Sequence, residues 1–66
     1  MRPPPQSSRR LLRLKAAAEY LSLSPWTLRR IIQAGELHVI VYEQNAPWLV
    51  DVRELDAWIE AHKTML

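Results

Sequence analysis

The separation between two short helical patterns restricts the fold of this chain more than any other feature of its sequence. Only residues 22–24 lie between the two patterns. In the first pattern, apolar side chains recur with the spacing of one buried helical stripe, at positions 14, 17, 18 and 21. We therefore predict a helix over residues 15–22. A longer helix that is capped by Ser8 and includes Leu11 is the alternative.

The second helical pattern has clear start and stop residues. Ser24 is a favoured N-cap, and Pro25 suits the first helical position, where its missing N–H costs nothing. The helix is predicted to run to about residue 34, because Gly35, the only glycine in the chain, suits a left-handed C-terminal cap. Two short helices joined by a three-residue turn indicate a helix-turn-helix unit.

The remainder of the chain is predicted to add a β-hairpin and a third helix. Residues 37–42 are rich in β-branched side chains, residues 44–47 have turn chemistry, and residues 48–50 suit a short returning strand. Asp51 begins the third helix as its N-cap, and Glu54 is placed to complete a capping box. The predicted fold class is therefore mainly α with a small β-hairpin.

Charge is distributed unevenly along the sequence. Residues 1–33 contain seven basic residues and one acidic residue, a net charge of +6, whereas residues 34–66 contain two basic and six acidic residues, a net charge of −4. This asymmetry predicts one face for a polyanion and another face for solvent. Two ordinary solvated patches are the alternative interpretation.

Polar and aromatic side chains gather on one side of the predicted second helix. At about 100° per residue, four side chains fall together opposite the apolar stripe: Trp26, Arg29, Arg30 and Gln33. Arginine can bind phosphate or guanine and glutamine can bind adenine, so this face suits DNA. The free N–H groups near Ser24 can also receive a phosphate. The alternative is that Trp26 packs on the N-terminal segment or on the hairpin, beside solvated arginines.

The first ten residues are predicted to form a tail outside the core. Three consecutive prolines favour an extended polyproline conformation, and the polar residues after them offer nothing to bury. We predict a flexible, basic, proline-rich tail over residues 1–10 and one folded domain over residues 11–64. Arg9, Arg10 and Arg13 are candidates for contacts with phosphates or a minor groove. A disordered leader without such contacts is the alternative.

Few residues in this chain suit enzymatic chemistry or a cofactor. The sequence has no cysteine and no glycine-rich phosphate loop, and His38 and His62 lie 24 residues apart without a ligand-spaced partner. We expect no enzymatic activity, no metal and no cofactor. No apolar run approaches the roughly 18 residues of a membrane span, so we expect a cytoplasmic protein without a membrane partner.

The order and spacing of these elements resemble those of a known family. Residues 14–21, 24–32 and 35–37, and then residues 52–59, are similar to the excisionase-type helix-turn-helix, a relative of the MerR-like DNA-binding domain. The resemblance implies a winged helix-turn-helix with its second helix in the major groove of DNA. The hairpin, or wing, would lie on an adjacent groove or on the backbone. Five side chains are thereby placed at the DNA surface: Ser24, Trp26, Thr27, Arg29 and Arg30.

The resemblance also implies a range of functions on double-stranded DNA. Small members of the family include excisionases, or recombination directionality factors, which bind and bend DNA near an attachment site and contact an integrase. Others regulate transcription, and related domains occur in phage packaging proteins. We expect an excisionase-like protein of a prokaryotic cell or phage, acting at the nucleoid, with an integrase and further copies of itself as candidate partners. A protein-interaction module without DNA binding is the alternative from another class.

Two positions depart from the pattern of the family. The turn of the family usually carries glycine where this chain has Ser22, and a non-glycine residue at positive φ costs on the order of 1 kcal/mol. The wing tip of the family is usually basic, whereas residues 43–47 contain one acid and no base. We therefore expect the N-terminal arginines to supply phosphate contacts, and Tyr42 and Trp48 to be available for protein contacts.

Overall fold

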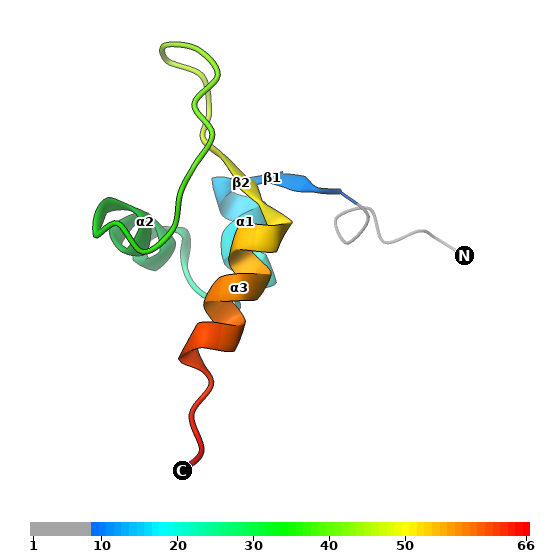
Figure 1. The fold of residues 1–66 in the computed structure, drawn as a ribbon. Coiled ribbons are helices and arrows are strands. Elements are labelled where there is room, and N and C mark those ends of the chain that lie inside the picture. Colours follow the sequence, from blue (N-terminus) through cyan, green and yellow to red (C-terminus); the bar gives the residue numbers. More distant parts are fainter. Residues whose placement is uncertain (1–8) are drawn as a thin grey trace.

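Three helices and a two-stranded antiparallel sheet make up the fold (Figure 1). The computed structural model describes residues 9–66. Along the chain the elements are β1 (Leu11–Arg13), α1 (Leu14–Tyr20), α2 (Pro25–Gln33), β2 (Leu49–Asp51) and α3 (Val52–His62). The predicted class, a mainly helical winged helix-turn-helix, is thereby confirmed. Residues 1–8 of the tail predicted over residues 1–10 lie outside the described residues.

The turn between α1 and α2 places a non-glycine residue in the left-handed region. The N–H of Leu23 donates to the carbonyl of Ala18 (2.9 Å). The N–H of Ser22 donates to the carbonyl of Glu19 (3.0 Å), which completes a Schellman cap. Ser22 adopts a φ of 59° in this cap, as the departure from glycine predicts. The helix ends at Tyr20, two residues earlier than expected, because the cap itself occupies the last positions.

Replacing Ser22 with glycine is expected to stabilise the protein, because glycine adopts positive φ without steric opposition. The left-handed region costs a serine about 1–2 kcal/mol, and the larger unfolded-state entropy of glycine offsets about 0.5–1 kcal/mol of the gain. We therefore expect the free energy of unfolding, measured by urea denaturation, to rise by about 0.5–1 kcal/mol. Gly35→Ala is the matched control with the opposite sign, because Gly35 has a φ of 86°. A less stable Ser22→Gly variant would contradict this account of the turn.

Helix α2 begins and ends close to the residues that the sequence predicts. The hydroxyl oxygen of Ser24 accepts from the N–H of Thr27 (3.1 Å), and Pro25 is the first helical residue. At the other end, Gly35 adopts its positive φ directly after the helix and closes a second Schellman cap. Local chemistry at both ends therefore sets the length of α2.

The sheet pairs two strands that lie far apart in the sequence. β1 runs antiparallel to β2, with Leu12 opposite Val50 and Arg13 opposite Leu49. The sequence predicts no strand over residues 11–13, and the preferred prediction does not include them in the first helix. They form a strand because the pairing with β2 gives hydrogen-bond partners to their backbone N–H and C=O groups. It also buries Leu12 in the core, where this side chain is 1% exposed.

The segment between α2 and β2 forms the wing, which projects from the helices as a long loop, green to yellow in Figure 1. Two backbone hydrogen bonds between Ile40 and Leu49 hold its base together. The N–H of Ala46 donates to the carbonyl of Glu43 and closes the tip, in the region where the sequence predicts a turn. Of the predicted strand over residues 37–42, only Ile40 takes part in pairing, so that strand is much shorter than expected.

The start of the wing is fastened to α3 instead of to a neighbouring strand. Leu37 is buried, and the N–H of His38 donates to the carboxylate of Glu54 (3.1 Å). The carboxylate of Asp51 caps α3 as predicted, by accepting from the N–H of Arg53 (2.9 Å). The second half of the predicted capping box is wrong, because Glu54 reaches to His38 instead of back to Asp51.

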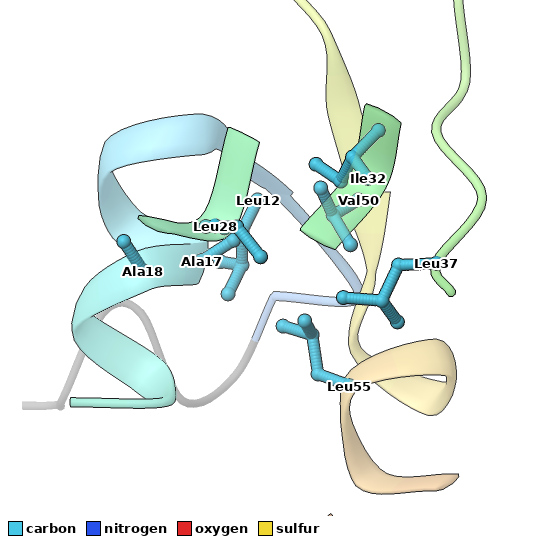
Figure 2. Packing of buried hydrophobic residues seen from close by; sticks show 8 residues of the cluster. All are labelled: Leu12, Ala17, Ala18, Leu28, Ile32, Leu37, Val50 and Leu55. Carbon is cyan, nitrogen blue, oxygen red and sulfur yellow. The ribbon is translucent and has the colours of Figure 1, made fainter. Parts of the chain in front are cut away.

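A single hydrophobic core joins every element to the first residues of the wing. Its members are Leu12, Ala17, Ala18, Leu28, Ile32, Leu37, Val50 and Leu55 (Figure 2). The two small alanines let α2 approach α1 closely, and the stripes of all three helices face inward as their periodicity predicts. None of the helices in residues 9–66 has the length and apolar character needed to cross a bilayer.

Candidate nucleic-acid interface

Helix α2 presents an outward face on the side opposite its buried stripe. Leu28 and Ile32 turn into the core. The exposed side chains of the other side are those that the sequence analysis places together, namely Trp26, Arg29, Arg30 and Gln33. Trp26 keeps 66% of its surface exposed, so it is not packed beneath another element. We call these four side chains the α2 face.

Two members of the α2 face stack on one another. The guanidinium carbon of Arg30 lies 4.9 Å from the centre of the Trp26 ring, one helical turn away. Such a cation–π contact is worth about 0.5–1 kcal/mol at an exposed site. It restricts a long side chain while leaving the in-plane N–H groups of the guanidinium free to donate. A guanidinium with free N–H groups can donate two hydrogen bonds to a guanine edge or to the oxygens of a phosphate.

The second arginine of the α2 face stacks on the wing instead of on its own helix. The guanidinium carbon of Arg29 lies 4.8 Å from the centre of the Trp48 ring, and Trp48 is half-buried against the core. Sequence reasoning placed Trp48 at a protein-contact surface and did not join it to Arg29. The contact between Arg29 and Trp48 cannot be predicted from sequence periodicity. It depends on the position that β2 gives to the residues of the wing directly before it.

Ser24 and Thr27 form a local pair at the start of α2. The Ser24 hydroxyl donates to Oγ1 of Thr27 (2.9 Å), and its oxygen accepts from the N–H of the same residue (3.1 Å). Thr27 is half-buried. Both side chains are therefore engaged in shaping the helix start, and their contact with DNA stays a prediction.

The three N-terminal arginines are separated by the fold. Arg10 donates to the carboxylate of Asp51 from Nη2 (3.0 Å) and from Nε (3.2 Å), which ties the entry of β1 to the start of α3. Arg9 and Arg13 instead line a shallow hollow that they share with Lys15 and Glu19. Of the three, Arg10 is thus held in an ion pair, whereas Arg13 lies near the α2 face.

The ion pair between Arg10 and Asp51 is expected to make stability depend on pH. Hydrogen bonds from Arg10, and next from the N–H of Arg53, hold the pKa of Asp51 below its ordinary value. In the unfolded chain the pKa returns to about 3.9. The stabilisation is therefore fully present above that pH and is lost as the pH falls through the lower pKa of the folded state.

Asp51→Asn keeps an N-cap acceptor but removes the charge, so we expect a lower Tm than the parent at neutral pH. The two Tm values should converge as the pH falls through the lowered pKa of Asp51 in the folded state, because the parent carboxylate then becomes neutral as well. Thermal melts followed by circular dichroism at a series of pH values measure this. Glu60→Gln, at an exposed carboxylate paired with Lys63, is the control and should change Tm little. A difference for Asp51→Asn that is equal at neutral and acid pH would contradict the charge explanation.

The two histidines lie away from the α2 face and pair with separate glutamates. Nδ1 of His38 lies 3.2 Å from Glu54, and Nε2 of His62 lies 3.5 Å from Glu36. His62 also stacks on Trp58, with ring centres 4.2 Å apart. Within the residues that the structure covers, no three His, Cys, Asp or Glu side chains are grouped to hold a metal ion. These pairs instead bind the start of the wing to α3.

Comparison with known proteins identifies one protein family whose model matches this sequence. A family model described as a helix-turn-helix domain matches residues 11–63, which is most of the chain. Neither the curated proteins nor the solved structures contain a match to this sequence. The matched range starts at β1 and ends directly after α3, so it includes the α2 face, the wing and the core.

Proposed function

Because this chain belongs to the helix-turn-helix domain family, we propose that it binds double-stranded DNA with α2 in the major groove. The observation that carries the proposal is the α2 face. It combines two guanidinium groups, an amide and an exposed indole on the second helix of the motif. These four side chains are exposed, and the opposite side of α2 supplies the contacts with the core.

The chemistry of the α2 face suits the edges of base pairs. Arg30, held by Trp26, offers two parallel N–H donors to O6 and N7 of guanine. Gln33 lies one turn further along the exposed side and can pair with adenine. Ser24, Thr27, Arg9 and Arg13 are proposed to contact the backbone around this face, and Arg10 contributes less because Asp51 engages it.

We propose further that the biological role is that of an excisionase-like recombination directionality factor. Such a protein has no chemistry of its own and acts by binding and bending DNA beside an attachment site, in the cytoplasm at the nucleoid. One short recognition helix binds modestly, so an integrase or adjacent copies of the chain would supply the remaining affinity. A small transcriptional regulator and a phage packaging subunit use the same surface and remain the alternatives.

The wing supports one function from a different class. Val41 and Tyr42 are exposed by 56% and 58%, and the neighbouring Glu43 is acidic. An exposed apolar pair beside an acid suits a protein contact better than a minor groove. A protein-interaction module without DNA binding is therefore the second candidate function.

Binding to DNA from the region around the gene tests the proposal directly. Duplexes that tile this region should be shifted in gel titrations, and footprinting should reveal repeated protected sites. About four to six phosphate contacts predict a log–log slope of affinity against salt of roughly −4 to −5. Failure to bind any of these duplexes at low salt, together with a stable complex with a protein, would replace the proposal with the interaction module.

The genes beside the coding sequence separate the DNA-based roles. An adjacent integrase gene and protected sites at an attachment site favour excision. A protected divergent promoter favours regulation, and a neighbouring terminase gene favours packaging.

A further inference from the structure

We propose that Arg13, Lys15 and Arg29, arranged around Trp48, form a second binding site that holds the phosphodiester backbone of DNA beside the α2 face. We call these four residues the phosphate cradle. The inference rests on the proposed function and adds to it a site for backbone contacts that uses the base of the wing instead of its tip. Lys15 and Trp48 have no place in the α2 face, so the site extends the interface onto α1 and the wing.

The phosphate cradle is assembled by three parts of the chain that meet at one hollow. Arg13 ends β1 and Lys15 lies in the first turn of α1, whereas Arg29 comes from the middle of α2. The antiparallel register sets Arg13 opposite Leu49, the residue after Trp48. The hollow is lined by all four residues of the cradle together with Leu14, Ala46 and Pro47. The fold therefore brings three positive groups from separate parts of the sequence around one concave surface.

The cations of the phosphate cradle have no salt-bridge partner among the described residues, and the nearby carboxylate of Glu19 lines a separate, neighbouring hollow with Arg13 and Lys15. Residues 1–8 contain no acid. No acidic side chain lines the hollow. Three cations that line one hollow repel one another, and an anion between them offsets part of that repulsion. A phosphodiester group carries one negative charge and acceptor oxygens that suit both arginine and lysine donors.

Trp48 is the positioning residue of the phosphate cradle. Its half-buried ring packs against the core, and the guanidinium carbon of Arg29 lies over the ring, 4.8 Å from its centre. Stacking of this kind leaves the in-plane N–H groups of Arg29 directed outward. The tip of the wing, residues 43–47, has one acid and no base, so the contribution of the wing to DNA binding is to hold Arg29 in place rather than to insert into a groove.

The phosphate cradle should contribute to affinity without contributing to sequence discrimination. Phosphate contacts position a protein on DNA, whereas contacts with base edges specify the sequence. We therefore expect Lys15→Gln to weaken binding to the target duplex and to a scrambled duplex by the same factor, about three- to tenfold at moderate salt. The magnitude of the salt slope should fall by about 1, which is the loss of one phosphate contact. Lys63→Gln removes an exposed lysine from the far end of α3 and should leave both quantities unchanged.

A double-mutant cycle tests the role of Trp48. Arg29→Gln and Trp48→Leu should each lower the magnitude of the salt slope by about 1, and the double variant should lower it by no more than either single variant. Circular dichroism melts show which variants remain folded at the assay temperature. If Trp48→Leu does not, Arg29→Gln and Lys15→Gln, both at exposed positions, test the site alone.

The outcomes separate this inference from the proposed function. Normal salt slopes in Lys15→Gln and Arg29→Gln, in a protein that binds its target well, would overturn the phosphate cradle and leave the α2 face standing. A changed ratio of target to scrambled affinity in Lys15→Gln would also overturn it, because the side chain would then read bases. Failure of the parent protein to bind any duplex would overturn both.

Discussion

Leu28→Ala is expected to lower the free energy of unfolding by about 2–5 kcal/mol, which is the usual cost of a large cavity in a core. Leu28 is fully buried near the middle of α2, where this helix packs against α1, and it belongs to the same core cluster as Leu12 and Val50 (Figure 2). A domain of this size has a total stability of only about 3–10 kcal/mol. The substitution therefore removes a large share of the total, and the Tm should fall by many degrees. Urea denaturation followed by circular dichroism measures the loss.

Leu11→Ala is the matched control for this prediction. Leu11 is the same residue type on β1, next to the buried Leu12, but it is 38% exposed. Its replacement should cost well under half as much as that of Leu28, because less apolar surface returns to water and no closed cavity forms. Equal losses in the two variants would contradict the core described here.

Arg30→Ala is expected to weaken binding to the target DNA by about 1–3 kcal/mol, which is roughly 5- to 150-fold in Kd. Arg30 is exposed and stacks only on Trp26, so its removal leaves the core and the thermal stability nearly unchanged. Loss of a guanine contact should also reduce discrimination between the target and a scrambled duplex. Titrations of both duplexes at one fixed salt concentration measure affinity and discrimination together.

Arg53→Ala serves as the control for charge alone. Arg53 is also exposed and carries the same charge, but it lies in the first turn of α3, among acidic residues. Its removal should change target affinity by less than about twofold, since weak surface charges far from a ligand are screened. Unchanged affinity in Arg30→Ala, or an equal loss in both variants, would show that the α2 face does not read DNA.

Local chemistry was sufficient to predict the helix-turn-helix itself. Ser24, Pro25 and Gly35 act on backbone groups within a few residues of their own positions, so the ends of α2 could be inferred without knowledge of the fold. The strain at Ser22 was predictable for the same reason, because the penalty at positive φ belongs to a single residue. The outward direction of the α2 face followed from helical periodicity.

The sequence analysis did not predict the contacts between residues that lie far apart along the chain. The pairing of β1 with β2 was missed, and the first strand of the hairpin was predicted too long. Residues 37–42 have strong β propensity, but propensity does not identify a partner strand. In the structure Leu37 is buried and the N–H of His38 donates to Glu54, so this segment contacts α3 instead. The same carboxylate was therefore unavailable for the capping box.

The sequence by itself determined the caps, the turn, the helical stripes and the four side chains of the α2 face, since each depends on residues within about one or two helical turns. Only the tertiary structure decided that Arg10 is held by Asp51 and that Arg29 lies over Trp48. The register of a sheet is selected by the total burial of both strands, and that quantity is a property of the folded chain and not of any short segment. The α2 face could thus be predicted from the sequence, whereas the phosphate cradle exists only because β1 pairs with β2.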